Sequence, residues 1–469
     1  MKKKLAYLCS SCGTQAIKWS GQCPSCKEWN TLEEMIVDAK KKNILSTGNN
    51  SFSKSKPLQR LSEVQSSKSD RIITKIGEFN RVMGGGIVRD SLTILTARPG
   101  AGKSTLLLQV ADDVASQGLN VLYASGEESE SQIKNRANRI LKDMNQNIWV
   151  ISDSNMDYVL NSAEEVNADL VIVDSIQTFT LDEHLPSRAG SPTQTMECAN
   201  ALLRLAKSSK KPRAVILIGQ MNKNEEIAGL RALEHLVDTV LVIDGDSGEE
   251  LRGITATKNR FGSTGETSFF SMMEDGMIPI ENPSEYFMTQ RDDNVSMPGS
   301  VLTVVREGTR PIILEIESLV AASFTPYPSR ISENIKREQL NTLISILEQR
   351  GGIELFNKNV VVKTTGGLKL NEQSSNLAVI MSIVSSVKNK GISSDTLFVA
   401  DIGLTGELKR IPSLDSRLKE AERMGFKYVY VAKGAISKNM NLKGLNIIEK
   451  NTLSEVINDV FGMTRSMPF

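Results

Sequence analysis

A glycine-rich segment between two apolar runs constrains this chain more than any other feature. Residues 97–105 read A-R-P-G-A-G-K-S-T. The short, β-branched run before it, at 91–96, predicts a buried strand, and the run after it, at 106–115, predicts a helix with an apolar face. A strand, a glycine loop ending in Lys-Ser and a helix, in this order, predict a phosphate-binding loop within an α/β fold.

Each residue type in the loop has a physical task. Gly100 and Gly102 let backbone N–H groups turn towards phosphate oxygens, and the helix N-terminus adds the positive end of its dipole. Lys103 is expected to bind the β- and γ-phosphates of ATP, and Ser104 to offer its hydroxyl to Mg²⁺. Ala97 replaces the first glycine of the pattern, and we expect it to keep the loop shape at some cost in nucleotide affinity. The predicted nucleotide-binding residues are Ala97, Arg98, Pro99, Gly100, Ala101, Gly102, Lys103, Ser104, Thr105 and Asp174.

Polar residues at the ends of three later apolar runs complete a predicted hydrolytic site. Asp174 ends the run at 170–174, where an acid holds the Mg²⁺ shell, although a lone Asp there also suits a helix N-cap. Glu127 is predicted to orient the attacking water, with Glu128 as the alternative base; a first-turn acid facing a helix dipole is the structural alternative. Gln220 is predicted to sense the γ-phosphate, and a capping or sheet-edge role has similar weight.

A basic segment follows the strand-like run at 252–257. Residues 258–262 read K-N-R-F-G, and in an extended chain Lys258 and Arg260 point to the same face. Two cations there suit either the γ-phosphate on a neighbouring subunit or the phosphates of DNA. A solvated basic strand is the usual explanation for K-x-R elsewhere.

Four cysteines near the N-terminus have the spacing C-x₂-C-x₁₀-C-x₂-C. Cys9, Cys12, Cys23 and Cys26 therefore predict a closed, structural four-thiolate Zn²⁺ site. A unit this short cannot build its own core, so the metal must hold it together. The tryptophans at 19 and 29 suit stacking on bases or covering the metal-binding turns, and we favour the second slightly.

Length and charge limit the number of domains and the kinds of partner that the chain can have. The 469 residues suffice for two or three domains, and no apolar run is long enough to span a membrane. The N-terminus has no secretion signal, so we expect a cytoplasmic protein without a membrane partner. Residues 1–75 hold 14 Lys and Arg against 6 Asp and Glu, a basic region that suits either nucleic acid or a solvated linker.

The apolar runs also predict an organisation along the chain. Strands are expected at 91–96, 120–124, 169–173, 214–218 and 239–243, and then at 301–305, 312–316, 360–362, 397–400 and 428–432, with helices at 334–349 and 374–388. The predicted domains are a zinc finger at 1–30, a flexible basic linker at 31–70, an ATPase domain at 71–280, a connector at 281–297 and an α/β domain at 298–469.

Taken in order, these segments resemble the bacterial RadA (Sms) family of recombination and repair ATPases over essentially the whole chain. The intact K-N-R-F-G is highly specific, and four further stretches support it: L-S-E-V at 61–64, S-G-E-E-S at 125–129, L-E-H-x-V-D at 233–238 and G-L-T-G-E at 403–407. The resemblance implies a RecA-like P-loop ATPase core, an N-terminal zinc finger and a C-terminal Lon-protease-like domain.

The resemblance also implies what the chain does. It implies a hexameric ring that hydrolyses ATP, moves on single-stranded DNA and drives branch migration of branched intermediates, with a RecA-type recombinase as partner. The chain departs from the family at Ala97, at Gln220, where the family usually has His and RecA itself has Gln, and at Leu230, where it usually has Pro.

The C-terminal domain raises a rival hypothesis, an ATP-dependent protease. Lon proteases use a Ser-Lys dyad; here Ser374 lies near the nucleophile position, but Asp415 aligns with the lysine. A serine without a base is a weak nucleophile, so we predict Ser374 to be a helix N-cap and the domain to be a non-catalytic platform for ring formation and DNA binding. A clamp that ATP only switches is the third hypothesis, and Lys103, Asp174 and Glu127 argue against it.

Overall fold

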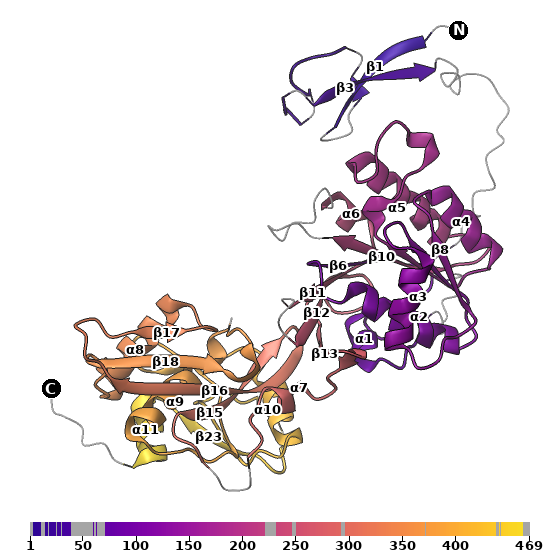
Figure 1. Ribbon diagram of the computed structural model, residues 1–469. Helices are drawn as coiled ribbons and strands as arrows, with labels where there is room; N and C mark the ends of the chain where they lie inside the picture. The colour runs from indigo at the N-terminus through magenta and orange to yellow at the C-terminus, as the bar shows by residue number, and fades with distance from the viewer. Residues whose placement is uncertain are drawn as a thin grey trace. The chain divides into compact units, whose positions relative to one another are not determined.

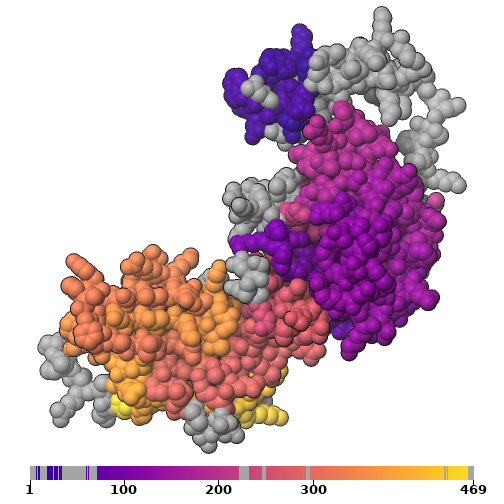
Figure 2. All heavy atoms as spheres, viewed as in Figure 1, coloured from indigo at the N-terminus to yellow at the C-terminus, as the bar shows by residue number. Residues whose placement is uncertain are grey.

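The computed structural model describes residues 3–10, 15–16, 18–24, 26–29, 31–38, 60, 62, 71–220, 231–245, 250–291, 296–370, 372–437, 440 and 442–462. The chain divides into two compact units, Met1–Thr264 with Phe270–Pro279 and Gly265–Phe269 with Ile280–Phe469 (Figure 1). Figure 2 draws the same units with all heavy atoms. Both contain sheets covered by helices, which confirms the predicted α/β class.

The N-terminal segment forms a small antiparallel sheet of its own. Its strands are β1 (Lys3–Cys9), β2 (Gln15–Ala16) and β3 (Leu32–Asp38), in the order β2-β1-β3. The strand β3 lies in the range that the sequence assigned to the linker. It pairs with β1 along its whole length, from Cys9 opposite Leu32 to Lys3 opposite Asp38, and this long-range pairing has no signal in the local composition.

A nine-stranded sheet is the framework of the first unit. Its strands are β6 (Leu92–Ala97), β7 (Val121–Ser125), β8 (Ile148–Ser152), β9 (Leu170–Asp174), β10 (Ala214–Gln220), β11 (Thr239–Asp244), β12 (Leu251–Asn259), β13 (Thr267–Met273) and β14 (Gly276–Pro279), in the order β14-β13-β12-β11-β6-β10-β9-β7-β8. The strands from β11 to β8 are parallel, and β12 returns antiparallel to β11. All five strands predicted in this region are present. The sequence analysis did not predict β8, β13 or β14.

Helices cover both faces of this sheet. They are α1 (Gly77–Val82), α2 (Lys103–Ser116), α3 (Glu130–Ile140), α4 (Met156–Glu165), α5 (Pro192–Ala206) and α6 (Arg231–Leu236), and a short ribbon, β4 (Arg71–Ile72) with β5 (Ile87–Val88), lies beside α1 in sequence. In β6, Leu95 packs with Leu107 of α2, whereas its neighbour Ile94 packs with Leu202 of α5. Successive side chains of a strand point to opposite faces, so β6 is buried on both sides, as its continuous apolar run predicts.

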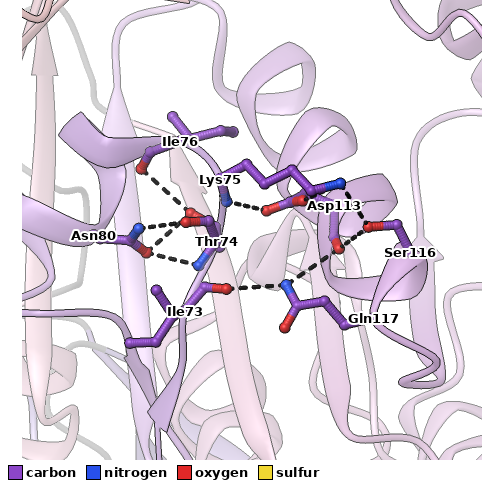
Figure 3. Close-up of polar contacts among 8 residues, drawn as sticks. All are labelled: Ile73, Thr74, Lys75, Ile76, Asn80, Asp113, Ser116 and Gln117. Carbon is purple, nitrogen blue, oxygen red and sulfur yellow. Dashed lines mark hydrogen bonds and ion pairs between the residues drawn. The ribbon is translucent and has the colours of Figure 1, made fainter.

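The segment before α1 fixes the far end of α2, the helix after the glycine loop (Figure 3). The Asn80 side chain accepts from the Thr74 N–H at 2.9 Å and donates to the Thr74 carbonyl at 2.5 Å, which closes a turn. From this turn the Lys75 N–H donates to the carboxylate of Asp113, and Gln117 donates back to the same segment at 3.0 Å. The helix is therefore held at its C-terminal end by side-chain bonds, and at its start by the loop that joins it to β6.

The second unit has a seven-stranded mixed sheet. Its strands are β15 (Ser300–Glu307), β16 (Arg310–Ala322), β17 (Arg330–Ser332), β18 (Lys358–Thr364), β19 (Thr396–Phe398), β22 (Tyr428–Ala432) and β23 (Asn446–Lys450), in the order β17-β18-β16-β15-β19-β22-β23, with a separate ribbon of β20 (Asp401–Ile402) and β21 (Leu408–Lys409). The helices are α7 (Pro283–Tyr286), α8 (Arg337–Gly351), α9 (Asn376–Lys388), α10 (Leu414–Arg423) and α11 (Leu453–Phe461). The five predicted strands and two predicted helices of this unit are present.

Two helices pack against the central strands of this sheet. The first ten residues of α9 are all buried, and the helix contacts β15 and β16 as well as α8. The helix α10 places Leu414 and Leu418 against Leu302 and Val304 of β15. None of the described helices of the chain is long and apolar enough to cross a bilayer.

Candidate nucleotide-binding site and metal centre

Four neighbouring parallel strands bring the predicted hydrolytic residues to one edge of the first sheet. The strands lie in the order β6-β10-β9-β7, so their carboxyl ends meet at the same edge. The glycine loop follows Ala97, which pairs with Gln220 at the end of β10. Asp174 ends β9 opposite Ser125, the last residue of β7. This edge is where open parallel sheets bind their ligands.

The glycine loop has the backbone that a phosphate cradle needs. Gly100 and Gly102 have φ angles of 79° and 99°, in the left-handed region that favours glycine. Gly102 precedes α2 without a side-chain cap, so the first N–H groups of the helix suit phosphate oxygens. Ala97 is the last residue of β6, so its backbone is extended, and its methyl group is buried. A left-handed residue is not required there, which explains why alanine fits in place of glycine.

Lys103 is folded over the loop, close to two carboxylates. Its Nζ donates to the carbonyls of Ala97 at 3.0 Å and Arg98 at 3.1 Å. Burial lowers the pKa of Lys103, and the charges of Asp174 and Glu127 oppose that shift. Carbonyls are weaker acceptors than phosphate oxygens, so an incoming nucleotide would compete well for this ammonium group.

The donor set expected for Mg²⁺ is preassembled. The Ser104 hydroxyl donates to Oδ2 of Asp174 at 2.7 Å, which joins the start of α2 to the end of β9. A hydroxyl and a carboxylate oxygen are hard ligands of the kind that Mg²⁺ prefers, so these residues fit the ion. A third group, which the sequence did not indicate, joins them: the Tyr123 hydroxyl donates to the same Oδ2 at 2.7 Å. Its only signal is a tyrosine inside an otherwise small and aliphatic buried run.

Glu127 and Glu128 have different surroundings. Glu127 is exposed, and its Oε1 accepts from the Ser175 hydroxyl at 2.5 Å and from Gln220 Nε2 at 2.9 Å. Glu128 forms a two-pronged ion pair with Arg136 of α3. Glu127 therefore faces the site and contacts its neighbours, whereas the second carboxylate is occupied by a cation of its own helix region.

A glycine sets the turn that presents Glu127. A Cβ on Gly126 would lie 2.2 Å from the Thr178 hydroxyl oxygen, closer than any side chain tolerates. The Gly126 N–H donates to the Asp174 carbonyl at 2.9 Å, which fastens this turn to the end of β9. The G-E-E sequence is thus fixed by the close packing of two strand ends.

Lys258 and Arg260 lie at the opposite edge of the sheet. Asn259 pairs with Thr239, and Thr239 pairs with Thr93 at the amino end of β6. Thr93 is four residues from the loop end of β6, about 13 Å at about 3.3 Å per residue. The structure therefore does not bring these two cations to the glycine loop of their own chain.

The two cations contact one short segment. The Lys258 ammonium donates to the carbonyls of Glu234 and Val237, the latter at 2.8 Å, and so caps the end of α6. Arg260 lies 3.5 Å from the buried carboxylate of Asp238 and is 56% exposed. Burial and the charge of Arg260 both lower the pKa of Lys258.

The rest of K-N-R-F-G holds the segment in place. Asn259 is buried and donates to the end of α1, and Arg71 donates to the Phe261 carbonyl at 2.9 Å. A Cβ on Gly262 would lie 2.7 Å from the Cα of Gly84, so two backbones touch where only glycine fits. The motif thus combines residues that are packed against the rest of the unit, Asn259 and Gly262, with two cationic side chains, Lys258 and Arg260.

The cysteine cluster fits a tetrahedral metal. The sulfur atoms of Cys9, Cys23 and Cys26 lie within 4.8 Å of one another, and those of Cys9 and Cys26 are 3.6 Å apart. Thiolates about 2.3 Å from a tetrahedral zinc ion would be about 3.8 Å apart, which is close to this spacing. Cys12, the fourth predicted ligand, lies outside the described residues.

The two tryptophans of this unit are mostly exposed. Trp29 is 70% exposed and Trp19 is 57% exposed. Neither is buried as a cover over the cysteine loops, which differs from the role we favoured from the sequence.

The C-terminal unit has no arrangement for a Ser-Lys dyad around Ser374 among the residues described. Ser374 is buried, and Asp415 accepts from the Ser437 hydroxyl at 2.8 Å. The predicted N-cap role of Ser374 is wrong: Ser375 precedes α9, and its hydroxyl donates to the Glu372 carbonyl. A short 3₁₀ turn at Gln373–Ser375 precedes α9 and moves the N-cap from position 374 to Ser375.

An ion pair with a buried cation and a partly exposed carboxylate lies beside this serine. Both carboxylate oxygens of Glu372 accept from the guanidinium of Arg417, at 2.7 and 2.6 Å, and Arg417 is fully buried. Burial opposes the charge of Glu372, but the bonds from Arg417 prevail and lower the pKa of that carboxyl. A guanidinium stays protonated and cannot act as a base, so this cation is not a substitute for the missing lysine.

Two family models match the regions that contain these two sites. The family model described as "AAA domain" matches residues 57–226, and the one described as "Rubredoxin metal binding domain" matches residues 7–34. Among solved structures, the crystal structure of the RadB recombinase is similar over 44% of this chain and 97% of that chain, with 22% identity and a TM-score of 0.35.

Curated relatives match from end to end. "DNA repair protein RadA" of Bacillus subtilis (strain 168) is 37% identical over 461 residues, which cover 98% of this chain and 99% of the relative. The protein of the same name from Streptococcus pyogenes serotype M1 is 38% identical over the same shares. Because the identity extends over both units and the cysteine segment, the chain belongs to the RadA family of DNA repair proteins.

Proposed function

We propose that this chain is a DNA-dependent ATPase that processes recombination intermediates. In this proposal it acts as a hexameric ring on single-stranded DNA and promotes branch migration during strand exchange by a RecA-type recombinase. The observation that carries the ATPase part is the joining of Glu127 to Gln220 and Ser175, beside Lys103 and Asp174. Membership in a family of DNA repair proteins supports the DNA part.

The glycine loop would bind the nucleotide. The first N–H groups of α2 and the ammonium of Lys103 supply positive charge where the β- and γ-phosphates would lie. Ser104 and Asp174 would hold Mg²⁺, which when bound neutralises phosphate charge. Since Ser104 already donates to Asp174, little rearrangement is needed to form this ligand pair.

Glu127 would orient and deprotonate the attacking water. Its carboxylate is exposed and lies next to the Lys103 charge, so it can face both solvent and a bound phosphate. Gln220 donates to the same carboxylate oxygen at 2.9 Å. A γ-phosphate that competes for this amide would change the end of β10, which is how Gln220 would report the presence of ATP.

Lys258 and Arg260 would act on a neighbouring subunit. They lie at the amino edge of the sheet, away from their own glycine loop, and Arg260 is 56% exposed. A ring in which this edge faces the glycine loop of the next chain would bring two cations to the γ-phosphate in trans. Direct binding of DNA phosphates is the alternative role for the same pair.

The other parts of the chain would support the motor. The cysteine cluster would hold Zn²⁺ through Cys9, Cys12, Cys23 and Cys26 and so stabilise the N-terminal sheet. The C-terminal unit would be a non-catalytic platform for ring formation and DNA binding, because the carboxylate–guanidinium pair beside Ser374 leaves it no base.

The proposal is tested by measuring ATP hydrolysis by the full-length protein with and without single-stranded DNA. We expect DNA to stimulate turnover. We also expect the active protein to sediment with the mass of a hexamer. Turnover that is present but indifferent to DNA would contradict the motor. Nucleotide binding without any turnover would favour a clamp that ATP only switches.

A further inference from the structure

One side chain at the nucleotide site is not part of the phosphate-binding pattern. Tyr123 is the middle residue of β7 and is fully buried, yet its hydroxyl reaches across to β9. It donates to Oδ2 of Asp174 at 2.7 Å. A phenol buried in a sheet is stabilised by such a bond, but a phenylalanine would fill the same space without any polar group to satisfy.

The bond converges with another on a single atom. Ser104, from the start of α2, donates to the same Oδ2, also at 2.7 Å. Two donors that approach one carboxylate oxygen from different elements fix the rotation of the carboxylate group. The second oxygen of Asp174 is then left for the shell of a metal ion between the strand end and the phosphates.

The acceptor of the Tyr123 hydroxyl is a carboxylate oxygen. Since a charged acceptor makes the bond stronger than one between neutral groups, its loss should be measurable.

The nearby Lys103 ammonium is a reason why the orientation of the Asp174 carboxylate must be fixed. The charge of Asp174 acts on the Lys103 ammonium, which the phosphates require. A carboxylate free to rotate would be drawn to that cation and away from the metal position. Tyr123 and Ser104 together oppose this rotation.

We propose that Tyr123 is a positioning residue for Mg²⁺, which holds the Asp174 carboxylate in the orientation that receives the ion. The inference rests on the proposed ATPase function and adds a residue that acts through Asp174. Groups behind a metal's direct ligands commonly change its affinity by about 10- to 100-fold when removed.

The test compares Tyr123→Phe with Tyr430→Phe in the full-length protein. Tyr430 makes a similar bond in the C-terminal unit, where its hydroxyl donates to Asp459 at 2.9 Å, so it is a matched control. Binding of a fluorescent, non-hydrolysable ATP analogue is measured in EDTA and across a Mg²⁺ titration. We expect Tyr123→Phe to raise the Mg²⁺ concentration for half-maximal binding roughly 10-fold, with the affinity in EDTA unchanged.

Other outcomes have separate meanings. An unchanged Mg²⁺ titration in Tyr123→Phe would overturn the inference, as would an equal loss of affinity with and without Mg²⁺, which marks a packing role. Wild-type protein that binds the analogue equally with and without Mg²⁺ would instead contradict the magnesium site itself.

A double variant gives a second, independent test. In an Asp174→Asn background the carboxylate charge is gone, so adding Tyr123→Phe should leave the Mg²⁺ titration unchanged within about twofold. If Tyr123→Phe still shifts the titration in that background, Tyr123 does not act through Asp174. Thermal melting of every variant confirms that differences in folding do not cause the shift.

Discussion

The glycine-loop site of the first unit and the Glu372–Arg417 pair of the second both join a carboxylate, a cation and a serine, but they leave different atoms available. At the glycine loop, Lys103 donates to backbone carbonyls and the carboxylate of Asp174 has hydroxyl donors. In the second unit both oxygens of the carboxylate face a fully buried guanidinium. At the glycine loop, Lys103 can therefore exchange its carbonyl acceptors for a ligand. In the second unit, Arg417 is already paired with both oxygens of a carboxylate, which a ligand would first have to displace.

The difference lies in what each cation bonds to. A cation on carbonyls gives up weak acceptors when phosphate arrives, so its burial favours binding of an anion. A buried cation that is bonded to a carboxylate would have to break that ion pair first, and the cost reaches about 3–5 kcal/mol where both partners are buried. The same residue types therefore suit ligand binding in the first unit, as we propose, and form a structural ion pair in the second.

Breaking the Glu372–Arg417 pair should have the largest effect, and that effect should be on stability. Arg417→Met leaves the Glu372 carboxylate without its cation, and we expect the C-terminal unit to lose about 3 kcal/mol of unfolding free energy in denaturant titrations. Nucleotide affinity should be unchanged. The control Ser374→Ala should change stability by less than about 1 kcal/mol, and a loss as large as that of Arg417→Met would contradict the assigned roles.

The same variant has a predicted pH dependence. The folded pKa of Glu372 is lowered from 4.5, so its charge stabilises the folded state above that pH and loses this effect as pH falls through the folded pKa. The stability difference between wild type and Arg417→Met should therefore shrink in acid. A difference that stays constant from neutral pH to pH values well below 4.5 would contradict the pair.

Removing the cation of the glycine-loop site should have a smaller effect, which should fall on ATP binding and not on the stability of the fold. Lys103→Ala is expected to weaken ATP binding roughly 100-fold, the loss of a strong charge-assisted contact, while stability changes little because the ammonium bonds only to carbonyls. Isothermal calorimetry and thermal melting measure the two quantities. Lys134→Ala, an exposed lysine of α3, is the control; equal weakening in both variants would refute the glycine-loop assignment.

Patterns between consecutive residues predicted most of the fold and part of the site. The glycine loop, the strand before it and the acid at the end of β9 are all encoded within a few neighbouring positions, and the structure has them there. The α/β class followed from such runs because continuous apolar segments need burial on both faces.

Long-range pairing explains what the sequence did not show. Tyr123 lies 51 residues from Asp174, and Glu372 lies 45 residues from Arg417, so no local pattern links them. The sequence favoured Glu127 and kept Glu128 as the alternative. The structure separates them by the ion pair of Glu128 with Arg136 and by the bonds that Glu127 accepts from Ser175 and Gln220. Ser374 was assigned as an N-cap because the 3₁₀ turn before α9 has no signal that distinguishes it from the helix itself.

The most direct test of the account uses the two adjacent glutamates. Glu127→Gln should lower ATP turnover by at least about 100-fold while nucleotide affinity is kept, because it removes the base and leaves the phosphate contacts. Glu128→Gln weakens only the pair with Arg136 and should keep turnover within a few-fold. The opposite ranking, or equal losses in both variants, would contradict the proposal that Glu127 activates the water at this site.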